Sequence, residues 1–121
     1  MAKARVVKSM LLEWYEPLLH TRTLAKNLVT PENVGSENLA VRAFRMEPGG
    51  TGERHQHEKM EHTFVILEGH VAVVCNDERY DLGPGDVIYI PPKVEHRFNN
   101  SGLRPAYILA AYSPPTEMKE E

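Results

Sequence analysis

From Leu39 onward, apolar and polar residues alternate in short runs that are typical of β-strands. Turn-forming Gly, Pro, Asn and Asp residues separate these runs at nearly regular intervals. The runs on either side of Glu68-Gly69 are predicted to pair as a hairpin over residues 62–75. This spacing predicts an all-β fold, either an antiparallel sandwich or a barrel. The predicted strands cover residues 39–46, 53–57, 62–67, 70–75, 79–82, 87–90, 96–98 and 106–112.

Residues 1–38 have a weaker pattern. The apolar positions between Ser9 and Leu19 fit a short helix or an extended arm, and Pro17 argues against a long helix. Turn-forming residues dominate 30–36, so we expect a loop there. The sequence therefore predicts three parts: an N-terminal arm or strand region that packs on the barrel or a partner, a β-barrel, and a frayed C-terminal tail. Their ranges are 1–38, 39–113 and 114–121.

Composition narrows the function classes. The 121 residues suffice for one domain, and 41% hydrophobic with 26% charged residues is ordinary for a globular chain. The net charge of −3 is spread along the chain, so we expect no nucleic-acid partner and no membrane association. The start of the chain does not fit a secretory signal. Cys75 is a single cysteine and cannot form an internal disulfide, which favours a cytoplasmic location.

Histidines cluster in the segment 49–69. His55, His57 and His62 lie within eight residues, between a glycine-rich turn and a strongly strand-forming run. His55 and His57 are two residues apart, so in an extended segment both imidazoles leave the same face. His96 follows a later strand-like run and is a fourth candidate. Neutral imidazole is the commonest metal ligand among side chains, so this pattern indicates a metal site.

Two motifs, which together cover residues 49–100, resemble those of the cupin family. In the first, Gly49 is followed by five residues and then His55-x-His57, and the closing glycine is Gly69. The second motif is matched at Gly85, Pro91, His96 and Asn100, while Lys93 stands where a glycine is usual. The resemblance implies a single jelly-roll β-barrel of the small, single-domain type. It also implies one divalent transition-metal ion per chain, with the ligands His55, His57, His62 and His96.

His62 occupies the place that a metal-binding glutamate usually holds in the family, and Glu61 is its rival for that role. Neighbouring residues in a strand point to opposite faces, so both cannot face inward without a bulge. Counting back from Gly69 selects His62, and Phe64 then shares its face. Glu61 is predicted to point outward or to accept a hydrogen bond from an imidazole N–H.

Four imidazole ligands would carry no charge, so they would leave a divalent ion with its full positive charge. Such an ion favours an anionic ligand such as a carboxylate or an enolate. Nitrogen-rich sites suit Fe, Mn, Ni, Cu or Zn better than Mg or Ca. The sequence does not choose among these metals.

We therefore favour a metalloenzyme that acts on a small, anionic organic molecule, with an Fe-dependent dioxygenase as the leading class. One rival is a non-catalytic or regulatory cupin that binds a small ligand. A second rival is a redox-neutral lyase, isomerase or cyclase that needs Lewis acidity alone. The apolar residues of the arm also predict a homodimer.

Other candidates receive structural roles. His20 and His70 fit neither motif and are predicted to lie on the surface. Cys75 is predicted to be a small buried residue rather than a nucleophile. Among the aromatic residues, Phe98 is the first choice for lining a cavity, because it shares a strand face with His96.

Overall fold

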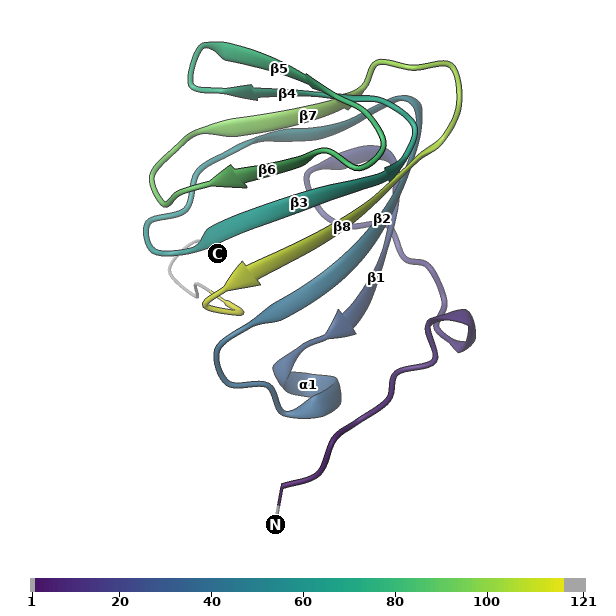
Figure 1. Ribbon diagram of the computed structural model, residues 1–121, viewed down its shortest axis with the longest axis vertical. Coiled ribbons are helices and arrows are strands. Elements are labelled where there is room, and N and C mark those ends of the chain that lie inside the picture. Colours follow the sequence, from purple (N-terminus) through teal and green to yellow (C-terminus); the bar gives the residue numbers. More distant parts are fainter. Residues whose placement is uncertain (1, 117–121) are drawn as a thin grey trace.

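The protein folds into one curved, antiparallel sheet of eight strands that nearly closes into a barrel (Figure 1). The computed structural model describes residues 2–116, apart from the side chains of Arg54 and His55. The strands are β1 (His20–Val29), β2 (Ala40–His55), β3 (Glu61–Glu68), β4 (Val71–Cys75), β5 (Glu78–Leu82), β6 (Val87–Ile90), β7 (His96–Asn100) and β8 (Ala106–Ser113). A 3-10 turn, η1 (Ser9–Leu11), and a one-turn helix, α1 (Pro31–Val34), precede β2. This architecture confirms the predicted all-β jelly-roll barrel.

The long strand β2 holds the two halves of the barrel together. Its first half pairs with β8 and its second half with β7, giving the strand order β5-β4-β7-β2-β8-β3-β6, while β1 also pairs with β2. The strand changes direction at Gly49-Gly50, where Gly49 has a φ of 80°. A Cβ on Gly50 would lie 2.8 Å from the carbonyl oxygen of Arg22, so glycine is required there. The prediction that a strand would stop at residue 46 is therefore wrong, because these glycines bend the strand without ending it.

The interior follows from alternation along the strands. In β3, His62, Phe64 and Ile66 are buried, whereas the residues between them are partly exposed. In β7, His96 and Phe98 are buried and Arg97 is exposed. Period-two patterning with one apolar face turned toward the core is the general rule for such sheets. This alternation places histidines on the same wall as the aromatic core.

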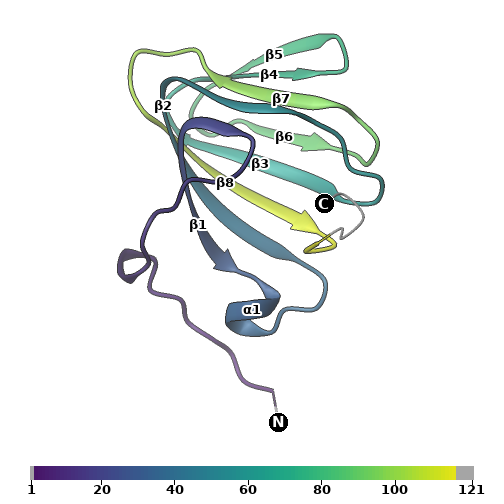
Figure 2. The same cartoon turned by 180° about the vertical axis from the view of Figure 1, so that it is seen from behind.

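The predicted hairpin over residues 62–75 is wrong. β3 pairs with β6 and β8, while β4 pairs with β5 and β7. Gly69 between them has a φ of 86°, and a Cβ there would lie 2.8 Å from Ala106 Cα. The chain passes closely over the start of β8 at this turn and crosses to the opposite side of the barrel (Figure 2). A turn signal between two predicted strands does not determine whether those two strands pair with each other.

The N-terminal region contains a strand that the sequence pattern did not single out. β1 pairs with β2 along most of its length, although register shifts interrupt the ladder. Before it, the arm runs along the β1 side of the sheet (Figures 1 and 2). Tyr15 forms an isolated bridge with Ala25 of β1, so this part of the arm packs on its own sheet. The tail residues 117–121, predicted to be frayed, lie outside the described part of the chain.

The predicted loop at 30–36 contains the short helix α1. The Thr30 hydroxyl accepts a hydrogen bond from the backbone N–H of Asn33, and the Asn33 side chain accepts one from the backbone N–H of Thr30. This capping box, Pro31 in the first turn and a left-handed Gly35 at the end account for one helical turn. Within residues 2–116, the helical segments are far too short to cross a membrane.

Candidate metal centre

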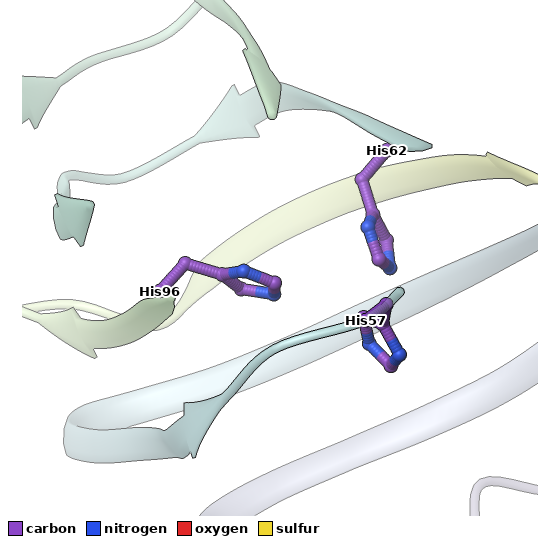
Figure 3. Close-up of side chains that lie close together, drawn as sticks. All are labelled: His57, His62 and His96. Atoms are coloured by element: carbon purple, nitrogen blue, oxygen red, sulfur yellow. The ribbon is translucent and has the colours of Figure 1, made fainter. Parts of the chain in front are cut away.

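Three histidines converge inside the barrel. One ring nitrogen each of His57, His62 and His96 lies within 4.8 Å of the others. The ring centroids are 4.9 Å apart for His57 and His62, 5.3 Å for His62 and His96, and 5.9 Å for His57 and His96. Figure 3 shows the three imidazoles lying close together on separate segments of the chain.

His62 reaches this space because it is the first inward position of β3. Its side chain is buried, at 8% exposure, whereas the preceding Glu61 is exposed. The Glu61 carboxylate accepts a hydrogen bond from the hydroxyl of Tyr89 on β6, with an oxygen–oxygen distance of 2.7 Å. That hydrogen bond is the first cause of the raised pKa of Tyr89. Strand alternation thus places His62 in the cluster and Glu61 outside the barrel.

His57 reaches the cluster from a loop, not from a strand. The predicted strand 53–57 ends at His55, and His57 lies two residues beyond. The backbone N–H of Lys93 donates to the His57 carbonyl at 2.7 Å and ties this loop to the chain before β7. Lys93 has a φ of 72°, a conformation that favours glycine. The glycine usual at this place in the motif therefore has a conformational explanation.

His96 is held in one tautomer. Its ring is only 1% exposed, and its Nδ1 lies 3.0 Å from the carbonyl oxygen of Val94. A carbonyl can only accept, so Nδ1 carries a proton, and in the neutral ring the lone pair is therefore on Nε2. Hydrogen bonding of one imidazole nitrogen to a carbonyl is the usual way in which a metal ligand is oriented through the other nitrogen.

His55, the fourth predicted ligand, is described through its backbone alone. Its Cα pairs with that of His96 in the ladder between β2 and β7. Its side chain lies outside the part of the chain that the structure describes. The described cluster therefore contains three of the four predicted residues: His57, His62 and His96.

A cavity of about 480 Å³ adjoins the cluster. His57 and His62 lie on its wall, together with apolar side chains from four strands: Phe44 and Met46, Phe64, Phe98, and Ile108. The edge of the cavity includes the exposed side chains of Leu18 and Leu19, so it opens there to solvent. An apolar pocket with a few converging polar groups is typical of small-molecule sites.

Several lining residues were not anticipated. His20, predicted to lie on the surface, lines the cavity and stacks on Phe44 with the ring centroids 5.5 Å apart. Arg42 and Tyr112 also line the cavity. The signal for Arg42 was its parity, since it is two residues before Phe44 on an inward face. His70 is exposed and Phe98 lines the cavity, as predicted.

Burial governs the titration of the groups near the cluster. Burial raises the pKa of the Tyr112 phenol, and the nearby positive charge of Arg42 opposes the shift. Tyr112 lies opposite His62 in the ladder between β3 and β8, with the rings 5.5 Å apart. Its hydroxyl therefore stays protonated at neutral pH. Burial also raises the pKa of the Cys75 thiol, which argues against a reactive thiolate.

The donor set fits a transition metal. Three imidazole nitrogens can close on one ion at the roughly 2.0–2.1 Å typical of zinc–nitrogen bonds, and nitrogen-rich sites suit Zn, Cu, Fe and Ni. No carboxylate belongs to the cluster among the described residues. The ion would therefore keep its charge for an external ligand.

Comparison with known proteins agrees with this architecture. The Cupin domain family matches residues 42–112, well over half of the chain. The chain belongs to the cupin family. This cupin is 39% identical over 61 residues to the uncharacterized protein MJ1618 of Methanocaldococcus jannaschii, covering 50% of this chain and 49% of that protein. It is 29% identical over 89 residues to the polyketide synthase CurC of Streptomyces cyaneus, covering 74% of this chain and 58% of that protein.

These alignments span about half the length of both relatives. Among solved structures, the polyketide cyclase RemF from Streptomyces resistomycificus superposes with a TM-score of 0.79 at 23% identity. The superposition covers 93% of this cupin and 83% of RemF. At that level of identity the likeness establishes a shared fold and nothing further.

Proposed function

We propose that this cupin is a metal-dependent enzyme that binds a small, anionic organic molecule at one divalent transition-metal ion. The observation that carries the proposal is the convergence of His57, His62 and His96 within 4.8 Å beside a cavity of about 480 Å³. The metal would act as a Lewis acid toward an oxygen of the bound molecule. The imidazoles are uncharged in their ligating form, so an anion is the favoured partner of the site.

His55 is proposed as the fourth ligand. The argument rests on backbone register, because His55 and His96 are Cα partners in an antiparallel ladder. Cross-strand partners share a face of the sheet, and His96 faces the cluster. Four ligands on a six-coordinate ion would leave two positions for the bound molecule, water or dioxygen.

The other residues near the cluster have supporting roles in this proposal. The Val94 carbonyl orients the His96 ring, and the apolar wall can contact the hydrocarbon part of the bound molecule. The protonated Tyr112 hydroxyl can donate a hydrogen bond to an oxygen of that molecule. These roles are the same for each of the reaction classes considered below.

Two reaction classes remain in this proposal. The leading class is an Fe-dependent dioxygenase, which needs open positions on the metal and an electron-rich anionic substrate. The second is a redox-neutral cyclase, lyase or isomerase, which the likeness to proteins described as a polyketide synthase and a polyketide cyclase favours. A small-ligand-binding or regulatory cupin is the non-enzymatic alternative.

We further propose that the protein is a homodimer and that it is located in the cytoplasm.

An anaerobic titration followed by oxygen consumption tests the proposal. Fe(II)-loaded protein should bind diketone, catechol or keto-acid probes with a spectral change at the metal. Oxygen uptake with a bound probe, lost in His96→Ala, would support the dioxygenase class. Binding followed by turnover without oxygen uptake would support the redox-neutral class, and binding without turnover would support the non-enzymatic alternative. Failure of every probe to reach the metal would contradict the proposed function.

A further inference from the structure

Arg42 is a cationic side chain on the inward face of the barrel. It lies on β2 at the same parity as Phe44 and Met46, which are buried, and it lines the same cavity as His57 and His62. Arg45, three residues later, points outward and pairs with Glu47 at 2.7 Å. Arginine has a high cost of desolvation, so a half-buried guanidinium on a cavity wall needs a reason.

The guanidinium is held by neutral groups along one edge. Its Nε donates to Asn27 Oδ1 at 3.2 Å, and its Nη2 donates to the Tyr15 hydroxyl at 2.7 Å. Tyr15 in turn donates to Asn27 Oδ1 at 2.6 Å, which closes a triangle of hydrogen bonds. In the part of the chain that the structure describes, these two oxygens are the acceptors of Arg42, and neither carries a charge.

The remaining N–H donors of the Arg42 guanidinium are preorganised and available to a ligand. A guanidinium has five N–H donors, and the triangle uses two of them. The side chain lies over the Phe44 ring, with its Cζ 5.3 Å from the ring centroid, and also over Tyr15 at 5.9 Å. Stacking on one face and hydrogen bonding on one edge fix the orientation, so the remaining N–H groups form a rigid donor set suited to a carboxylate.

The arginine lies apart from the histidine cluster. His62, Tyr112 and Ala40 form one cross-strand row, and Arg42 belongs to the next inward row. Two strand spacings across and two residues along correspond to roughly 12 Å between the Cα positions of His62 and Arg42. Both side chains shorten that span by extending into the cavity. One small molecule can therefore reach both groups at once.

We propose that Arg42 is a carboxylate-binding subsite, and that this cupin selects small organic acids carrying a carboxylate remote from the group that reaches the metal. The inference rests on the proposed metal site and adds a class of substrate to it. Glu32 of α1 also lines the cavity and opposes anion binding through its negative charge. Tyr15 acts through Arg42 and is a positioning residue, which gives the N-terminal arm a part in recognition.

Calorimetry on the Zn-loaded protein tests the subsite. The probes are the straight-chain dicarboxylates from malonate to adipate, each compared with the monocarboxylate of equal chain length. At least one dicarboxylate should bind about 10- to 100-fold more tightly than its monocarboxylate, as a charge-assisted bidentate pair predicts. Arg42→Gln should reduce that ratio because it removes the positive charge. Arg42→Lys should also reduce it, because Lys keeps the charge but loses the planar, bidentate donor geometry. Tyr15→Phe should reduce it partially, and Glu32→Gln should increase it.

Arg45→Gln is the matched control, since it removes an outward-facing arginine from the same strand and should leave the ratio unchanged. The metal content of each variant and its thermal unfolding show whether it is folded. A ratio near one for every chain length in the wild type, or an unchanged ratio in the Arg42 variants, would overturn the subsite. If monocarboxylates still bind at the metal in that case, the proposed function survives; if no carboxylate reaches the metal, both proposals fail.

Discussion

The backbone N–H of Lys93 donates to the carbonyl of His57 at 2.7 Å, and Lys93 makes this contact in a left-handed conformation with a φ of 72°. A lysine that is distant from His57 in sequence thus fixes the loop that carries this imidazole. The conformation costs about 1–2 kcal/mol for a residue with a Cβ. The backbone of Lys93 is therefore strained, and its hydrogen bond holds His57 in position.

Lys93→Gly should relieve this strain. The gain is reduced by the larger backbone entropy of glycine in the unfolded chain, so we expect a net stabilisation of about 0.5–1 kcal/mol. Urea unfolding of the metal-free protein measures it. Asn99→Gly, at an exposed position of β7, is the control and should be destabilised by about 0.5–1 kcal/mol. A Lys93→Gly variant less stable than the wild type would show that the conformation carries no strain.

His62→Ala and Glu61→Ala should differ strongly in metal affinity. His62 belongs to the cluster, whereas the Glu61 carboxylate faces outward toward Tyr89. We expect a loss of at least about 100-fold for His62→Ala, and less than about 10-fold for Glu61→Ala. Competition titration with a chromogenic chelator provides the numbers. The reverse order would mean that β3 shifts by one residue when the metal binds.

Tyr112 should make the protein less stable at alkaline pH. Burial raises the pKa of its phenol in the folded state, so above about pH 10 the unfolded chain loses this proton before the folded protein does. The unfolded state then binds fewer protons, and stability falls as the pH rises, by up to about 1.4 kcal/mol per pH unit from this group. Tyr112→Phe should show a shallower decline between pH 9 and 11 in urea unfolding.

Tyr107→Phe, on the same strand, is the comparison for the removal of a phenol hydroxyl. An equal decline in the wild type and Tyr112→Phe would mean that Tyr112 is not the source of the pH dependence.

Because the ordinary pKa of imidazole is about 6.5, metal affinity should also fall as the pH drops through that range.

A homodimer is a further prediction. The arm exposes Met10 at 90%, Leu11 at 81% and Leu18 at 88%, and the sheet exposes Tyr89 at 57%. From these exposed apolar side chains we predict that part of this surface packs on a partner. Light scattering at high micromolar concentration should give twice the chain mass, and Met10→Ser with Leu11→Ser should weaken the dimer if the arm is the contact. A wild-type mass equal to one chain would contradict the prediction.

The alternation of residues along single strands predicted which side chains point into the barrel. The inward direction of His62 followed from counting residues along one strand, and the same parity placed Phe98 on the cavity wall. The pairing of β3 and β4 was wrong, because the turn at Gly69 crosses the barrel through contacts with Ala106, which is distant in sequence. Arg42 was missed for a similar reason: its partners Tyr15 and Asn27 lie on separate segments that only the fold brings together.

The metal content and ligand environment of the purified protein test the central claim most directly. Protein isolated without chelators, or reconstituted and desalted, should hold about one divalent transition-metal ion per chain. X-ray absorption should show nitrogen ligands at roughly 2.0–2.2 Å, and the metal should be lost in His62→Ala and His96→Ala variants that remain folded by circular dichroism. A folded wild-type protein that contains no metal and does not take up added Fe, Mn, Ni, Cu or Zn would contradict the account.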